Sequence, residues 1–309
     1  MKTVHVGGRP VSAMVLGLMR IAGRPDDEVR RLVGAALDAG VTMIDHADMY
    51  GRTLHECERR FAEAMRLTPS QRDALTIQSK VGVLRDGPRY DLSYEHVVAG
   101  VEGSLAALRT DRLDVLLLHR PDPLVEPEEV ARAVDDLHAA GKVLAFGVSN
   151  HTPRQVELLQ RHLRQPLVVN QLQLSLTHAP VITQGLVSNM RDEPQATVQD
   201  GGGVLDFCRL HDITVQAWSP FQAGFLDGVF LGSPRHPELN AVIDRVAREH
   251  GVPPIAVATA WITRHPAGMQ VVLGSTTPER VVDACRGADV VLTRVEWYDL
   301  LRAAGHRVP

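Results

Sequence analysis

Short apolar runs alternate with amphipathic segments along most of this chain, and this alternation is the feature that most constrains its fold. Runs of about four to eight β-branched or aliphatic residues are typical of strands buried on both faces of a parallel sheet. The predicted strands cover residues 15–18, 41–45, 75–80, 113–119, 145–149, 168–174, 214–219 and 270–274. The helices predicted between them include residues 26–39, 93–108, 127–140, 153–163, 205–211 and 238–250.

Alternation of this kind predicts a parallel sheet closed into a (β/α)8 TIM barrel. A doubly wound sheet is the main alternative, but the G-x-G-x-x-G turn that follows the first strand of such a sheet is missing from the sequence. A length of 309 residues fits one barrel. We therefore expect an α/β fold with a single domain over residues 1–309, preceded by an N-terminal β-hairpin and followed by an extra C-terminal helix that begins at Thr293.

One lysine stands in an unusual place. The chain has three lysines and thirty arginines, and Lys80 ends the predicted strand 75–80. An ammonium group costs several kcal/mol to bury without a partner, whereas its pKa can be shifted by its surroundings. Lys80 could also extend from the strand end into solvent.

Polar residues end two further predicted strands. Asp45 follows residues 41–44 and is itself followed by Tyr50, while His119 follows residues 113–118. In (β/α)8 barrels the chemistry takes place at the carboxyl ends of the strands. The sequence therefore predicts that these side chains meet Lys80 at one end of the barrel.

Each of these residues also has a plainer interpretation. Tyr50 could be a half-buried tyrosine with a hydrated hydroxyl, and His119 a hydrogen-bonded core histidine. His46 and Asp48 have the His-x-Asp spacing of some barrel metal sites, but no second cluster of ligands follows the later strands, so we predict no metal. Lys80 could instead form a Schiff base in a barrel lyase.

Composition excludes several classes of protein. A net charge of -4 with acidic residues interleaved among the arginines argues against a nucleic-acid partner, and no apolar stretch approaches the length of a membrane span. The three cysteines are far apart and outside any C-x-x-C pattern, which is typical of a reducing compartment. We expect a cytoplasmic protein.

The ordered motifs of the chain resemble those of the aldo-keto reductase family. They are Asp-His-Ala-Asp-Met-Tyr-Gly at 45–51, His-Arg-Pro-Asp-Pro at 119–123, Gly-Val-Ser-Asn at 147–150, Asn-Gln at 170–171, Ala-Trp-Ser at 217–219 and Gly-Ser at 274–275 with Arg280. They cover nearly the whole chain and are particularly similar to bacterial YdhF-type oxidoreductases.

This resemblance implies a nicotinamide-dependent reductase of aldehydes or ketones with a catalytic tetrad of Tyr50, Asp45, Lys80 and His119. Tyr50 would protonate the developing alkoxide as the general acid. Lys80, paired with Asp45, would tune the phenol, whose ordinary pKa is about 10. His119 would orient the carbonyl by a hydrogen bond.

The resemblance also implies the residues that bind the cofactor. Ser149, Asn150 and Gln171 would hold the nicotinamide carboxamide, and Trp218 would stack on the ring, where Tyr is common in the family. The remaining cofactor residues implied are Met19, Arg20, Asp45, Ser219, Phe221, Gly274, Ser275, Thr276 and Arg280. Gly274 stands where many members have a Lys, and Asp283-Ala284 replaces a common Glu-Asn pair. Because Arg280 is retained, we predict NADPH in preference to NADH.

Two further expectations concern the substrate and the assembly. The substrate would be a small carbonyl compound that contacts a mostly apolar lining from Met19, Leu124, Phe221, Phe225 and a long loop over residues 175–203. A monomer is favoured. The alternative to a reductase is a slow-turnover regulatory or sensor subunit that binds NADPH, because the family includes potassium-channel β subunits.

Overall fold

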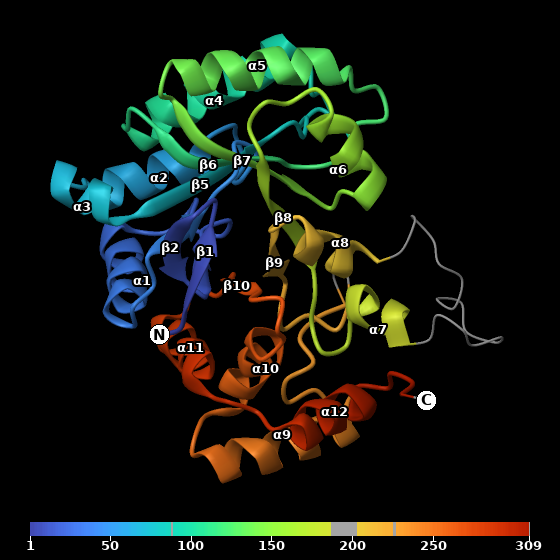
Figure 1. The fold of residues 1–309 in the computed structure, drawn as a ribbon. Helices are drawn as coiled ribbons and strands as arrows, with labels where there is room; N and C mark the ends of the chain where they lie inside the picture. The colour runs from blue at the N-terminus through green and yellow to red at the C-terminus, as the bar shows by residue number, and fades with distance from the viewer. Residues whose placement is uncertain (88, 187–202, 225–226, 309) are drawn as a thin grey trace.

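A computed structural model describes residues 1–87, 89–186, 203–224 and 227–308. Eight parallel strands close into a barrel in the order β10-β3-β4-β5-β6-β7-β8-β9 (Figure 1). The strands are β3 (Met14–Gly17), β4 (Met43–Asp45), β5 (Thr76–Val81), β6 (Leu113–Leu118), β7 (Val143–Ser149), β8 (Leu167–Gln173), β9 (Thr214–Trp218) and β10 (Gln270–Leu273). The predicted α/β barrel is therefore confirmed.

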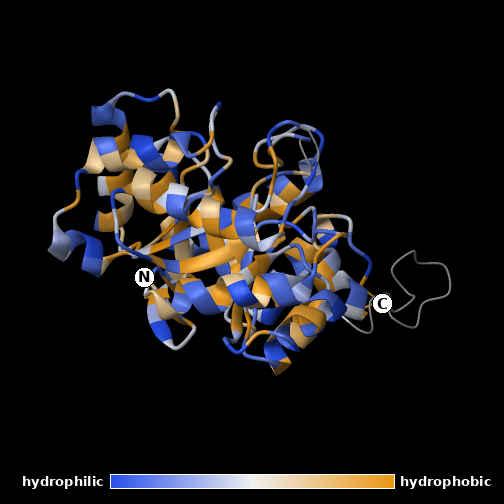
Figure 2. Cartoon of the chain, turned by 90° about the horizontal axis from the view of Figure 1, so that it is seen from above, coloured by the Kyte–Doolittle hydropathy of each residue, from blue (hydrophilic) through white to orange (hydrophobic). Residues whose placement is uncertain are grey.

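Helices surround the strands (Figure 1). They are α1 (Asp26–Asp38), α2 (Glu56–Met65), α3 (Pro69–Ala74), α4 (Tyr94–Leu108), α5 (Pro127–Ala139), α6 (Pro153–Gln160), α7 (Pro180–Leu186), α8 (Val204–Leu210), α9 (Pro237–His250), α10 (Pro254–Thr263), α11 (Pro278–Cys285), the 3₁₀ helix η1 (Arg286–Asp289) and α12 (Arg294–Ala303). Figure 2 shows hydrophobic residues gathered on the strands and hydrophilic residues on the outward sides of the helices. The main apolar core thus lies between the barrel and its helices.

An N-terminal hairpin covers one end of the barrel. Strands β1 (Thr3–Val6) and β2 (Arg9–Ser12) pair antiparallel, with Thr3 opposite Ser12. Their buried valines form one apolar cluster with residues inside the barrel, including Val15, Met43 and Leu117. Because the hairpin closes the amino end, ligands can reach the strands from the opposite, carboxyl end.

The C-terminal helix is also confirmed. In α12 the Thr293 side chain accepts a hydrogen bond from the Glu296 backbone, and the Glu296 side chain accepts one from Thr293, which is the capping box expected from the sequence. Trp297 of this helix stacks on Trp261 of α10 with ring centroids 5.1 Å apart. The extra helix therefore belongs to the same packed core as the barrel helices.

Part of the long loop predicted over residues 175–203 is a helix instead. Residues 180–186 form helix α7, whose Ile182 and Thr183 are buried. The part of the predicted loop over residues 187–202, and Phe225, lie outside the described residues. In the part of the chain that the structure describes, no helix combines the length and the apolar character needed to cross a bilayer.

Candidate active site

Four predicted residues meet at the carboxyl end of the barrel. Asp45 ends β4, Lys80 is the fifth residue of β5, and His119 directly follows β6. The chain after β4 continues to pair with β5, since the backbone amides of His46 and Asp48 donate to the carbonyl oxygens of Gln78 and Lys80. This pairing holds the start of the loop that brings Tyr50 back over the end of the barrel.

Lys80 has a hydrogen-bond acceptor for each of its three protons. Its fully buried ammonium donates to Asp45 Oδ2 at 2.7 Å, to the main-chain oxygen of His46 at 2.7 Å and to the Tyr50 hydroxyl at 3.1 Å. The alternative in which Lys80 extends into solvent is therefore wrong. A buried cation with this partner set is compensated, and it is placed to act on the phenol.

The second oxygen of the Asp45 carboxylate is bound as well. Gln78 Nε2 donates to Asp45 Oδ1 at 2.6 Å, and Gln171 Nε2 donates to the same atom at 3.2 Å. An ammonium and two amides therefore hold this carboxylate by charge-assisted hydrogen bonds. Asp45 thus supplies a fixed negative charge beneath Lys80.

The pKa values of the pair move in directions set by burial and by charge. Burial alone lowers the pKa of Lys80, but Asp45 and Tyr50 outweigh it, so the Lys80 pKa is raised and the ammonium stays protonated. Burial raises the pKa of Tyr50 above its ordinary value, and the Lys80 charge opposes this rise without cancelling it. Tyr50 is therefore a neutral phenol, able to donate its proton, with a cation beside it.

His119 is neutral for related reasons. Burial lowers its pKa well below the usual range, and the positive charges of Lys80 and Arg120 lower it further. Its ring meets the Tyr50 ring edge to face, with centroids 5.9 Å apart. A neutral imidazole carries one N–H, so His119 can donate a single hydrogen bond to a ligand beside the phenol.

The loop that carries Tyr50 is anchored from two sides. Arg85, which follows β5, donates to the main-chain oxygens of Met49, Gly51 and Arg52. On the inner side, buried Glu58 accepts from the Ser79 hydroxyl at 2.5 Å and lies 2.6 Å from His55 Nδ1. Because Ser79 precedes Lys80 in β5, Glu58 ties the loop and helix α2 to the strand that carries the lysine.

His46 and Asp48 lie in the same buried region. Burial lowers the pKa of His46 to about 4 and raises that of Asp48 to about 7, the latter with help from the charge of Glu58. Neither His46 nitrogen has a hydrogen-bond partner among the described residues. Nowhere in those residues do three or more His, Cys, Asp or Glu side chains form a group that could hold a metal ion.

Four of the predicted cofactor residues are brought together by hydrogen bonds. Ser149 Oγ donates to the Gln171 main-chain oxygen at 3.0 Å, and Asn150 Nδ2 donates to Ser149 Oγ at 2.7 Å. Trp218 Nε1 donates to Asn150 Oδ1 at 3.2 Å. Asn150 has a φ of 59°, a left-handed conformation that Asn tolerates better than most residues. These bonds form one polar group that reaches Asp45 through Gln171.

The other predicted cofactor residues lie on loops around the same barrel end. Exposed Met19 and Arg20 follow β3, while Ser219, also with a positive φ, and Phe221 follow β9. The last four occupy the loop between β10 and α11 and the first turns of that helix, namely Gly274, Ser275, Thr276 and Arg280. A hydrogen bond of 3.0 Å from Arg24 Nη2 to Thr276 Oγ1 joins this loop to the loop after β3.

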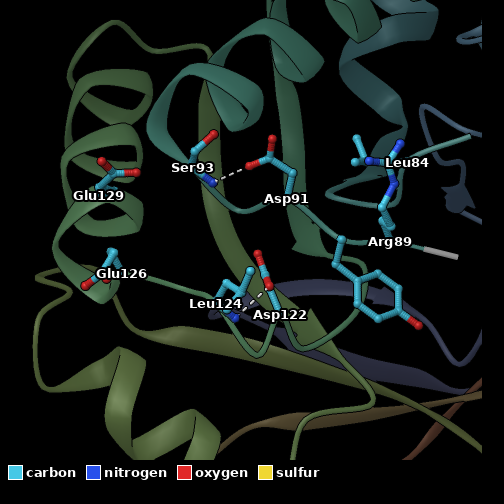
Figure 3. Close-up of a pocket in the computed structure, with 9 residues that line it drawn as sticks. Leu84, Arg89, Asp91, Ser93, Asp122, Leu124, Glu126 and Glu129 are labelled. Atoms are coloured by element: carbon cyan, nitrogen blue, oxygen red, sulfur yellow. Dashed lines mark hydrogen bonds between the residues drawn. The ribbon is translucent and has the colours of Figure 1, made fainter. Parts of the chain in front are cut away.

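A cavity of about 300 Å³ is lined by residues of the loops that follow β5 and β6, and none of the four predicted catalytic residues is among them (Figure 3). Asp122 connects the two loops, because its oxygens accept from the backbone amides of Leu92 and Leu124. Leu124, predicted to contact the substrate, lines this cavity with 85% of its surface exposed. Tyr90 also lines it. Arg120, which follows His119, lies with its Cζ 5.6 Å from the centroid of the Trp218 ring.

Comparison with known proteins agrees with the fold and the motifs. A model of the aldo/keto reductase family matches residues 13–302. The chain is 36% identical to the oxidoreductase YdhF of Escherichia coli over 99% of this chain and 98% of the relative. It is 33% identical to a 6-dehydroglucose reductase of Agrobacterium fabrum over 95% of this chain and 94% of the relative. The crystal structure of a thermostable aldo-keto reductase bound to the inhibitor epalrestat superposes with a TM-score of 0.78, at 23% identity, over 98% of this chain and 100% of that chain.

The chain therefore belongs to the aldo/keto reductase family and is an NAD(P)H-dependent oxidoreductase. The resemblance seen in the sequence motifs, including that to YdhF-type oxidoreductases, is confirmed.

Sequence reasoning assigned no role to several residues that the structure places around the site. Gln78 contacts Asp45, and Gln216 contacts both Gln78 and Gln171. A signal was present, because Gln78 stands two residues before Lys80 and so faces the same side of the strand. Glu58 and Arg85 carried no such signal, since their partners lie on other segments.

Proposed function

We propose that this chain reduces an aldehyde or ketone to an alcohol by hydride transfer from NADPH, with Tyr50 as the general acid. One observation carries the proposal, namely that the buried Lys80 ammonium binds both the Asp45 carboxylate and the Tyr50 hydroxyl. A phenol held against a cation can lose its proton to an acceptor and leave a stabilised anion. If Tyr50 were only a half-buried tyrosine with a hydrated hydroxyl, its hydrogen bond from a buried ammonium would have no explanation.

When bound, the reduced nicotinamide supplies the hydride that adds to the carbonyl carbon. Tyr50 gives its proton to the carbonyl oxygen, so an alcohol forms and a phenolate remains beside Lys80, whose Nζ lies 3.1 Å from the Tyr50 oxygen in this structure. Asp45 holds Lys80 in place and offsets the cost of burying its charge. His119, neutral and beside the phenol, donates its hydrogen bond to the same carbonyl oxygen and so orients it.

The polar group around Asn150 fits a nicotinamide. Gln171 already donates its amide protons to Asp45 Oδ1 and to Gln216 Oε1, so its own Oε1 is the atom it can offer to a carboxamide N–H. Ser149 and Asn150 supply neighbouring polar groups, and Trp218 supplies an aromatic face. This arrangement suits a flat amide-bearing ring placed next to Tyr50 and His119.

The loop before α11 fits the phosphates of the same cofactor. A Cβ added to Gly274 would meet no atom within 4 Å, so the backbone there is open to a ligand. Ser275 and Thr276 offer hydroxyl groups next to the first turn of α11, and Arg24 is bonded to Thr276. Together with Arg280 this gives two guanidinium groups for the adenosine phosphate, which favours NADPH over NADH.

The test is consumption of NADPH, followed by its absorbance, with 4-nitrobenzaldehyde and a panel of aldehydes, ketones and keto-sugars. The keto-sugars are included because a relative is named as a 6-dehydroglucose reductase. We expect one NADPH consumed per alcohol formed and a lower kcat/KM with NADH. Tight NADPH binding without turnover of any compound would favour a sensor subunit, and failure to bind either nucleotide would sink the proposal.

We also infer that the chain acts as a cytoplasmic monomer with one domain over residues 1–309. The support is that β3 to β10 form one closed barrel and that all three cysteines are buried as free thiols. Light scattering of the purified protein checks the inference of a monomer, because a dimer would double the measured mass.

A further inference from the structure

Four glutamines lie inside the barrel, where strands usually place branched apolar side chains. They are Gln78 of β5, Gln171 of β8, Gln216 of β9 and Gln270 of β10. Gln78, Gln216 and Gln270 have no exposed surface, and Gln171 has 3%. Burying an amide is unfavourable unless its groups are hydrogen-bonded, so the partners of these four side chains matter.

The four amides form a connected set that we call the glutamine ladder. Gln78 and Gln216 come from strands on opposite sides of the barrel and bond to each other in both directions, at 2.8 and 3.1 Å. Gln216 also donates to Gln270 Oε1 at 2.9 Å, and Gln270 donates to the Ser12 main-chain oxygen at 2.8 Å. The ladder therefore runs from the hairpin end of the barrel to Gln78.

The upper end of the ladder meets Asp45. Gln78 Nε2 makes the shortest contact, 2.6 Å to Asp45 Oδ1, while Lys80 binds Oδ2 of the same carboxylate at 2.7 Å. With its two oxygens held by donors from two side chains of β5, the carboxylate can adopt only one orientation. The Gln78 amide cannot turn away, because Gln216 holds both its oxygen and its nitrogen.

We propose that Gln78 is a positioning residue for carbonyl reduction, which fixes Asp45 against Lys80 and thereby sets the proton affinity of Tyr50. The inference rests on the proposed function. Gln78 acts through Asp45 and Lys80, and Gln216 holds its amide in one orientation.

The direction of the effect follows from the charges. The titratable and charged groups that face Asp45 or Tyr50 from the surrounding elements are Lys80, His46, His119 and Arg120. The charge of Asp45 raises the pKa of Tyr50, and a hydrogen bond from an amide weakens the effect of a carboxylate's charge. Loss of the Gln78 donor therefore raises the pKa of Tyr50 and moves the basic limb of the pH profile to higher pH.

The ladder itself offers a matched control. Gln270 is as buried as Gln78 and also bonds to Gln216, but its other bonds go to the Ser12 main-chain oxygen and to Met43 Sδ, and it makes none to Asp45. Gln78→Met and Gln270→Met each replace an amide by an unbranched side chain of similar length and leave Gln216 short of a partner. Both variants should lose stability, the first somewhat more because Gln78 also donates to a carboxylate, and only the first should alter the reaction.

The experiment measures kcat, KM for NADPH and the pH dependence of kcat/KM for both variants and the unaltered protein, alongside denaturant unfolding without cofactor. We expect Gln78→Met to lower kcat by about ten- to a hundredfold, as for loss of one hydrogen bond to a charged group, with an upward shift of the basic limb. The KM for NADPH should change little. Gln270→Met should keep the kcat and pH profile of the unaltered protein.

Equal kcat and equal pH profiles in the two variants would overturn the inference. If Gln78→Met does not fold, Gln78→Asn replaces it, because an amide one methylene shorter cannot keep both Asp45 and Gln216. A folded Gln78→Asn with unchanged kinetics would overturn the inference equally. Absence of carbonyl turnover by the unaltered protein is a separate result, which would reject the proposed function and, with it, any role of Gln78 in that reaction.

Discussion

Two buried ion pairs stand at opposite ends of the barrel, and they use different cations. At the carboxyl end Lys80 pairs with Asp45 at 2.7 Å. At the amino end Arg72 of α3 pairs with Asp114 of β6 at 2.9 Å, and Arg9 of the hairpin pairs with the same carboxylate at 2.5 Å. Both carboxylates are almost fully buried.

The partners of the two cations show what each pair does. Arg72 also donates to Thr110 Oγ1, to the Leu75 oxygen and to the Arg112 oxygen, all of them fixed parts of the fold. Lys80 directs one of its three bonds to the Tyr50 hydroxyl, a group that can gain or lose a proton. The Arg72 pair therefore stabilises the fold with a cation that is always charged, whereas the Lys80 pair places a lysine beside an ionisable hydroxyl, where we propose that the reaction takes place.

The largest effect is expected from Lys80→Met, which removes the cation of the functional pair. The Tyr50 phenolate would lose its stabilising charge and Asp45 would be buried without its partner. We expect kcat to fall by at least about a hundredfold. Measured with NADPH at saturation, a kcat within tenfold of the unaltered protein would break the distinction between the two pairs.

The matched change at the other end is Arg72→Met. It leaves Asp114 in an ion pair with the partly exposed Arg9, and removal of one partner of a buried pair costs about 3–5 kcal/mol. We expect a loss of roughly 3 kcal/mol in the free energy of unfolding and an unchanged kcat below the unfolding transition. Denaturant unfolding checks the loss of stability, and NADPH consumption checks that kcat is unchanged. A large fall in the kcat of the folded variant would contradict a purely structural role of Arg72.

A smaller effect is expected near the carboxyl end of the barrel, where Asp48 should make the stability of the protein depend on pH. Burial and the nearby Glu58 charge raise the pKa of Asp48 to about 7 from an ordinary value of 3.8. The folded state thus favours the protonated carboxyl, so the stability that Asp48 contributes is lost as pH rises from about 4 towards 7, by about 1.4 kcal/mol per pH unit.

Asp48→Asn removes this dependence because the amide imitates the neutral acid. The free energy of unfolding of the variant, minus that of the unaltered protein, should rise by roughly 2 kcal/mol from pH 5 to pH 7. The neighbouring His46, whose pKa is lowered to about 4, is present in both proteins and its contribution cancels in the difference. A difference that stays constant with pH would show that Asp48 does not titrate in this range.

The smallest effect concerns Trp218, where the chain departs from the Tyr common in the family. Trp218→Tyr keeps an aromatic face and loses the bond from Nε1 to Asn150. We expect the dissociation constant for NADPH to rise by a few fold, equivalent to about 1 kcal/mol. Fluorescence titration with NADPH measures it, and a rise beyond about a hundredfold would show that Trp218 does more than offer a ring.

The sequence predicted the barrel because eight short runs typical of buried strands alternate with amphipathic segments along most of the chain. It did not predict α2, since this helix begins after His55 in a left-handed conformation and without a side-chain cap. It also missed α10, in which Ala256 to Thr263 are all buried, so no amphipathic period marks it. Helix signals fail where a helix lies wholly inside the core.

The site likewise contains residues that the sequence could predict and contacts that it could not. Asp45, Lys80 and His119 were predictable because the carboxyl ends of barrel strands converge, whatever the register. The contact between Gln78 and Gln216 was not, because it depends on which strands lie across the barrel from each other. The pairs of Glu58 with Ser79 and of Arg72 with Asp114 likewise join segments whose proximity only the packed fold defines.

The most direct test of the account compares Tyr50→Phe with the unaltered protein. Both are measured for NADPH binding by fluorescence and for NADPH consumption with an aldehyde at saturating cofactor. If Tyr50 is the proton donor, Tyr50→Phe binds NADPH with similar affinity and loses about a hundredfold or more in kcat. A variant that binds NADPH and still turns over the aldehyde at the rate of the unaltered protein would contradict the central claim.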